Sequence, residues 1–216
     1  MKGYDCFIFD MDGTVSDTNR LIYDSFNHIA SIYGGKKYSD GEITKMFGPP
    51  EEDALLAVVG KDVIQRAMDD YLAFYRQRHR DLARLHPGME QLLARLKSRK
   101  KKVALFTGKG RHTTAISLDE FQIGKYFDYV VTGNDVENHK PSGDGIRKVL
   151  GYFALPPDSA LMVGDSVSDV KAARDARVAV AAVLWDSYAK EQVMRMNVDY
   201  LFHDVAEFSD WLDQLP

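Results

Sequence analysis

The sequence predicts an α/β fold in which a doubly wound parallel sheet carries an inserted helical segment. The first observation is a series of short, unbroken apolar runs, which are typical of parallel strands buried on both faces. The second is that helical apolar patterns separate most of these runs, so that strand and helix alternate from Met89 onward. The runs expected to form strands are Cys6–Phe9, Val103–Phe106, Tyr129–Val131, Ala160–Val163 and Val178–Leu184.

The third observation is a long stretch between the first run and Val103 that holds no convincing strand. It predicts helices instead, because its apolar residues recur at helical spacing between start and stop signals. Those signals are the possible N-cap Thr18, the pair Gly34-Gly35, the capping-box pair Ser39 and Glu42, the acidic start after Pro49-Pro50, and Gly60.

These patterns divide the chain into a Rossmann-like core, residues 1–15 and 85–216, and a helical cap, residues 16–84. Pro87-Gly88 indicates the return to the core. Ligands of open α/β sheets bind beyond the carboxyl ends of the strands. A cap inserted after the first strand is therefore expected to lie over the site as a lid that excludes water and selects substrates.

The composition bounds the class of protein. The chain has 216 residues, of which 45% are hydrophobic, and a net charge of −4 from 28 basic and 32 acidic residues. This balance argues against nucleic acid or an anionic membrane as a partner. The single cysteine, Cys6, excludes a disulfide within the chain and a cysteine zinc cluster. No signal peptide or 18-residue apolar span is found. We therefore expect a cytoplasmic monomer or homodimer that acts on a small metabolite.

Polar clusters follow four of the predicted strands. The first is Asp10-Met11-Asp12-Gly13-Thr14. Two carboxylates that reach one pocket repel each other, so a cation such as Mg²⁺ is their natural partner. A calcium loop or a surface turn also fits this pair when it is taken alone.

The second and third clusters supply groups suited to an anion. Thr107 and Gly108 end a strand, where a hydroxyl and backbone N–H groups can donate to phosphate. Lys140 precedes Pro141 in a turn and could neutralise a carboxylate and a phosphoryl group together. Each of these short motifs also occurs in ordinary turns and surface loops.

The fourth cluster is Gly164-Asp165-Ser166-Val167-Ser168-Asp169, which follows the run ending at Val163. Asp165 is a candidate metal ligand, and Asp169 could support it directly or through water. Asp169 could instead be the N-cap of a helix that opens near it.

In order and spacing, the four clusters resemble the motifs of the haloacid dehalogenase superfamily, over nearly the whole chain. The position of the cap resembles the phosphoglycolate phosphatase, pyrophosphatase and β-phosphoglucomutase group. The resemblance implies a phosphatase that works through an aspartyl phosphate, with Asp10 as nucleophile and Asp12 as general acid and base. It also implies that Thr107 and Gly108 hold the phosphoryl oxygens and that Lys140 offsets negative charge.

The resemblance further implies a Mg²⁺ site made by the Asp10 side chain, the Asp12 backbone carbonyl and Asp165, with Asp169 in or just behind it. Candidate cap contacts to substrate are Thr18, Arg20 and the turn at Gly48-Pro49. A phosphoglycolate-type phosphomonoester is the expected substrate.

Several alternatives stay open at this point. Within the family they are an inorganic pyrophosphatase and a β-phosphoglucomutase-like phosphotransferase, although the mutases carry a cap histidine where this chain has Ile22. Outside it they are a phospho-receiver module, which needs no large lid, and a binding protein without turnover, in which the catalytic positions need not all be filled.

Overall fold

The core is built on one parallel sheet of six strands, as the apolar runs predict. The computed structural model describes residues 3–215. The strand order is β5-β4-β1-β6-β7-β8, and every adjacent pair is parallel. The strands are β1 Cys6–Phe9, β4 Lys102–Phe106, β5 Tyr129–Val131, β6 Ala160–Gly164, β7 Ala179–Val183 and β8 Tyr200–Phe202.

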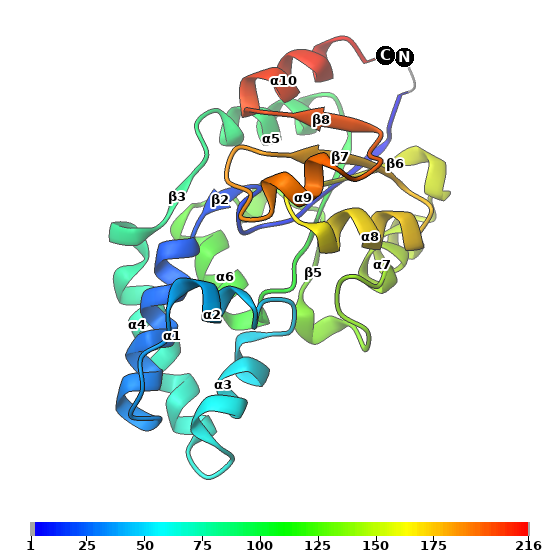
Figure 1. The fold of residues 1–216 in the computed structure, drawn as a ribbon. Helices are drawn as coiled ribbons and strands as arrows, with labels where there is room; N and C mark the ends of the chain where they lie inside the picture. The colour runs from blue at the N-terminus through cyan, green and yellow to red at the C-terminus, as the bar shows by residue number, and fades with distance from the viewer. Residues whose placement is uncertain (1–2, 216) are drawn as a thin grey trace.

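Helices cover both faces of this sheet (Figure 1). Successive strand residues point to opposite faces. Phe7 and Phe9 therefore pack against α5 (Met89–Ser98) and α10 (Val205–Asp213). Ile8 packs on the other side, with α7 (Asp144–Phe153), α8 (Val167–Asp175) and α9 (Lys190–Met194). Short 3₁₀ helices span Gly124–Tyr126, Gly133–Asp135 and Pro157–Ser159.

Four helices follow the first strand and share an apolar core of their own. Figure 1 shows them on one side of the sheet, in blue to turquoise. Leu21, Phe26, Leu55 and Tyr71 are buried among them, with the core helix α6 (Arg111–Glu120) contributing Ile116. They are α1 Asn19–Tyr33, α2 Asp40–Thr44, α3 Glu51–Val59 and α4 Ile64–Leu82.

The predicted helix starts and stops are confirmed, and only the side chain of Thr18 does not act as a cap. Helix α1 ends before Gly34, Ser39 and Glu42 form a capping box, and α3 ends before Gly60. Thr18 occupies the N-cap position of α1, but its hydroxyl makes no capping hydrogen bond. It donates instead to Asp12, so the predicted N-cap position is confirmed but the side chain of Thr18 does not cap the helix.

The chain leaves and re-enters the core through a two-stranded antiparallel ribbon. Strand β2 (Ser16–Asp17) pairs with β3 (Arg84–Leu85), and Arg84 donates to Asp17 at 2.7 Å. We propose this ribbon as the boundary between the core and the cap, at the predicted division of residues 16–84. Within residues 3–215, no helix combines the length and apolar character needed to cross a bilayer.

Candidate active site

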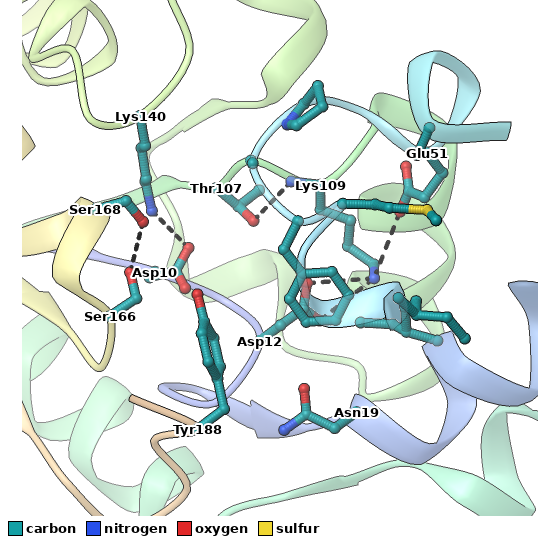
Figure 2. A pocket seen from close by; sticks show the side chains of 18 of the residues that line it. Asp10, Asp12, Asn19, Glu51, Thr107, Lys109, Lys140, Ser166, Ser168 and Tyr188 are labelled. Carbon is teal, nitrogen blue, oxygen red and sulfur yellow. Dashed lines mark hydrogen bonds and ion pairs between the residues drawn. The ribbon is translucent and has the colours of Figure 1, made fainter. Parts of the chain in front are cut away.

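The four polar clusters meet at the carboxyl ends of β1, β4 and β6 and in the loop before α7. In a parallel sheet these strand ends lie along one edge, so residues distant in sequence become neighbours. Figure 2 shows Asp10, Thr107 and Lys140 around one pocket, with Asp12 farther towards Glu51 of the cap. The sequence predictions for these clusters therefore fall in a single place.

Three buried carboxylates form the centre of the site. Asp10, Asp165 and Asp169 each place an oxygen within 4.8 Å of the others. Burial raises the pKa of Asp10 to about 7, although Lys140 acts to lower it. Burial, with the charge of Asp169, also raises the pKa of Asp165 well above its ordinary value. The uncompensated negative charge makes this cluster suited to a cation.

One fully buried oxygen of this cluster has no partner among the described residues. Asp165 accepts a hydrogen bond on Oδ1 from Thr14 Oγ1 at 2.9 Å, whereas its buried Oδ2 has none. Gly13 makes room for this carboxylate, because a Cβ at Gly13 would lie 2.7 Å from Oδ2. A buried carboxylate oxygen that no donor satisfies fits a Mg²⁺ ligand, since Mg²⁺ takes carboxylate oxygens.

Lys140 supplies the cation nearest to the cluster. Its Nζ lies 2.7 Å from Asp10 Oδ1 and 2.6 Å from Asp169 Oδ1. Burial acts to lower the pKa of Lys140, but the charges of Asp10 and Asp169 outweigh it and raise the pKa above its ordinary value. Lys140 therefore stays protonated between two carboxylates.

Asp169 is held by its own helix as well as by Lys140. Its Oδ2 accepts from Ser166 N at 3.0 Å and from Ser166 Oγ at 2.6 Å. Ser166 is the N-cap of α8, and Asp169 is the third helical residue in a capping box. The alternative prediction of Asp169 as N-cap is thus wrong. Since both its oxygens have partners, Asp169 is better placed to orient its neighbours than to be a principal metal ligand.

Asp12 lies outside the acidic cluster and faces the cap. Its carboxylate accepts from Thr18 Oγ1, and Lys109 Nζ lies 3.3 Å from each of its oxygens. The carboxylate of Asp12 is not one of the three clustered groups. A metal contact of Asp12 through its backbone carbonyl stays a prediction.

Lys109 is the functional candidate that the sequence predictions missed. Its side chain is 1% exposed, and its Nζ lies 3.7 Å from Glu51 Oε1 and 4.7 Å from the ring centre of Tyr75. Glu51 and Tyr75 belong to cap helices, whereas Lys109 follows a core strand. Lys109 therefore joins Asp12 to the cap. The only sequence signal was its place directly after Thr107 and Gly108.

The cap loop before α3 rests on core glycines. A Cβ on Gly108 would lie 2.6 Å from the carbonyl oxygen of Gly48, and a Cβ on Gly110 would lie 2.4 Å from Glu51 Oε2. The backbone N–H of Gly110 donates to that same oxygen at 2.7 Å. Thr113 Oγ1 donates to the other Glu51 oxygen at 2.7 Å. The close approach thus depends on glycine at both core positions.

The predicted cap contacts have different positions relative to the pocket. Gly48 and Pro49 line it, together with Thr107 and Gly108 of the core. Thr18 reaches the site through Asp12. Arg20 is not among the lining residues. Its side chain is 65% exposed and pairs with Asp24 at 2.9 Å, one helical turn away. The structure therefore argues against Arg20 as a substrate ligand, whereas its neighbour Asn19 lines the pocket.

A family model described as haloacid dehalogenase-like hydrolase matches residues 7–183. The chain belongs to this family. A protein of Caldanaerobacter subterraneus, named provisionally as the pyrophosphatase PpaX, is 34% identical over 92% of this chain and 90% of its own. The pyrophosphatase PpaX of Bacillus cereus is 28% identical over 93% of this chain and 92% of its own.

Solved structures share the fold at lower identity. A predicted phosphoglycolate phosphatase from Haemophilus somnus superposes with a TM-score of 0.82 and 22% identity, covering 99% of this chain and 98% of its own. CbbY from Rhodobacter sphaeroides, solved with phosphate, has a TM-score of 0.82 and 19% identity, covering 96% of each chain. The chain thus shares its overall fold with these two proteins.

Proposed function

We propose that this enzyme is a Mg²⁺-dependent phosphatase that hydrolyses a small phosphomonoester through an aspartyl phosphate on Asp10. The observation that carries the proposal is the buried cluster of Asp10, Asp165 and Asp169 beside Lys140, with Asp165 Oδ2 unpartnered among the described residues. This arrangement suits phosphoryl transfer, which depends on positioning and charge neutralisation. Mg²⁺, held by Asp10 and Asp165, would supply the neutralisation of charge on the phosphoryl oxygens.

In the first proposed step, an oxygen of Asp10 attacks phosphorus and the bond from phosphorus to the ester oxygen breaks. Asp12 gives its proton to the departing alcohol oxygen. In the second step, a water attacks the phosphorus of the aspartyl phosphate and Asp12 takes the proton of that water. Inorganic phosphate leaves and Asp10 is restored.

Other residues hold the reacting groups in place. In this proposal Thr107 and the N–H of Gly108, which line the pocket at the end of β4, donate to phosphoryl oxygens. Lys140 offsets charge on Asp10 and on the phosphoryl group. Thr18 and Lys109 fix the carboxylate of Asp12 on the side of the pocket where a leaving group would lie.

The sequence predicts a phosphoglycolate-type substrate, and inorganic pyrophosphate is the second candidate. Pyrophosphate is supported by the names of the relatives at 34% and 28% identity. A mutase reaction is less favoured, because Ile22, at the position where the mutases carry a histidine, lines the pocket with an apolar side chain. A small phosphorylated metabolite as partner, a monomer or homodimer, and a cytoplasmic location all stay predictions.

The test is phosphate release from a panel of phosphomonoesters and pyrophosphate, with Mg²⁺ and with excess chelator. We expect Mg²⁺-dependent turnover that Asp10→Asn abolishes, because the amide is neither charged nor nucleophilic. The matched control is Asp210→Asn, at an exposed carboxylate of α10. Turnover by Asp10→Asn at the wild-type rate would exclude Asp10 as the nucleophile. Full turnover in chelator would exclude the metal requirement.

A further inference from the structure

The pocket has two unlike walls. The core wall carries the acidic cluster and Lys140, where a phosphoryl group would bind. Most side chains of the cap wall are apolar, with Asn19, Glu51 and Tyr71 as its polar members, and Tyr188 of the core adds a ring at the same pocket. The apolar cap residues that line it include Ile22, Phe26, Ile43, Met46 and Phe47. A leaving group bound against this wall loses contact with water, which favours apolar groups and disfavours charged ones.

Neither cation in the pocket is free to receive a second anionic group. Among the described residues that line it, Lys109 and Lys140 are the basic ones. Lys140 lies between Asp10 and Asp169. Lys109 lies between Asp12 and Glu51. The carboxylate of phosphoglycolate or the second phosphoryl group of pyrophosphate would thus meet Asp12 and Glu51 without an uncommitted cation to offset the repulsion.

Tyr71 adds a polar group that lacks a partner. It lines the pocket from helix α4, is fully buried, and its hydroxyl has no hydrogen bond to any described residue. Its ring stacks on Tyr75 with the ring centres 6.1 Å apart, which fixes its position. A buried hydroxyl that the protein leaves unsatisfied is a candidate partner for a ligand.

We propose that the leaving group is an uncharged alcohol with an apolar body and one hydrogen-bonding group that pairs with the Tyr71 hydroxyl. This inference rests on the proposed phosphatase function and narrows its substrate class. The substrate is then a phosphate ester of an aryl-alkyl or branched alcohol. Phosphoglycolate and pyrophosphate become poor substrates of the same site.

The first test compares kcat/KM for benzyl phosphate, 2-hydroxyethyl phosphate, phosphoglycolate and pyrophosphate, with Asp10→Asn as the inactive control. The aromatic substrate is benzyl phosphate and not phenyl phosphate, because a phenol is a better leaving group than an alcohol. Faster turnover of phenyl phosphate would therefore not report on binding to the apolar wall. We expect benzyl phosphate to exceed phosphoglycolate at least about tenfold, which is the discrimination an apolar pocket supplies for small differences in a substrate. The kcat/KM for 2-hydroxyethyl phosphate, whose leaving group is small and uncharged, should lie between those for benzyl phosphate and phosphoglycolate.

The outcomes separate this inference from the function on which it rests. Faster turnover of phosphoglycolate or pyrophosphate would overturn the inference and leave the phosphatase proposal standing. Phosphate release from none of the four compounds would overturn both.

Two variants test the walls of the pocket directly. Met46→Arg places a cation on the cap wall, and we expect the ratio of phosphoglycolate to benzyl phosphate turnover to rise at least about fivefold. Met194→Arg, at an exposed residue of α9, is the control and should leave the ratio unchanged. Tyr71→Phe should lower kcat/KM more for 3-hydroxybenzyl phosphate than for benzyl phosphate, which has no group to pair with the Tyr71 hydroxyl. An unchanged ratio in Met46→Arg, or equal losses on both esters in Tyr71→Phe, would count against the inference.

Discussion

Replacing Lys109 by methionine should destabilise the protein more than the loss of an ion pair at the surface does. Lys109 Nζ lies 3.3 Å from Asp12 and 3.7 Å from Glu51, and its side chain is 1% exposed. Methionine keeps much of the apolar stem of lysine, so the substitution mainly removes the charge, which also lies 4.7 Å from the ring centre of Tyr75. Asp12 and Glu51 would then face each other without a cation between them.

The size of the effect follows from the contacts. At an effective dielectric constant of about 20, two unit charges 3.3 Å apart attract by about 5 kcal/mol before desolvation is counted. Removing one partner of a buried pair costs about 3–5 kcal/mol. Asp12 and Glu51 keep 20% and 13% of their side-chain surface exposed, so water partly compensates them. We therefore expect a loss of about 3 kcal/mol in the free energy of unfolding.

The assay is urea unfolding at pH 7, with Lys97→Met as the matched control. Lys97 pairs with Asp128 at 2.5 Å, but both side chains are 30% exposed. Its loss should cost at most about 1 kcal/mol. Adding Glu51→Gln to Lys109→Met should recover part of the stability, because one uncompensated charge is then removed. Equal losses in Lys109→Met and Lys97→Met would refute the role of Lys109 as a buried link between Asp12 and the cap.

Three further predictions concern the proposed catalytic acid, the packing of the core and the pH range of stability. Asp12→Asn should slow turnover by about 10²–10⁴ and let acid-quenched protein retain labelled phosphate; unchanged kinetics would contradict the role of Asp12. Gly145→Ala should lower the urea midpoint, because its Cβ would lie 2.1 Å from the Phe106 ring, whereas Gly151→Ala in the same helix meets nothing within 4 Å and should raise it. Burial lowers the pKa of His79 to about 4, so its neutral form contributes stability above pH 6.5 that is lost as the pH falls through 4. The urea midpoint should fall over that range, and it should fall less in His79→Gln; equal slopes would contradict this assignment.

Most strands of the core could be predicted because a buried strand leaves a local signal in the sequence, a short run of apolar residues. Cys6–Phe9 matches β1 residue for residue, since a strand covered on both faces needs an unbroken apolar run. Tyr129–Val131 matches β5 as well, although β5 is an edge strand in which Tyr129 and Val130 are only half-buried. The strand Tyr200–Phe202 was missed. It is a three-residue edge strand with the same burial as β5, and an apolar run this short does not distinguish a strand from a piece of helix.

The residues of the candidate site that could be predicted from the sequence are those that lie at strand ends. Asp10, Thr107 and Asp165 lie together because parallel strands place their carboxyl ends on one edge. The positions of Arg20 and Lys109 depend on the docking of the cap. Arg20 lies on the solvent side of α1, and Lys109 is buried because Glu51 approaches it from a distant part of the sequence. No local pattern encodes such contacts between elements.

Because β2 pairs with β3, the helical segment between them is an insertion whose two ends lie side by side at one point of the core. Ser16 pairs directly with Leu85, so the residues between them could be exchanged for another segment without changing the order or connections of the strands in the main sheet. The acidic cluster and Lys140 lie wholly outside this inserted segment. Under the proposed function, descendants of one core would acquire new leaving-group preferences by replacing a single contiguous stretch of gene. Grafting this stretch onto a related core is the corresponding route for engineering.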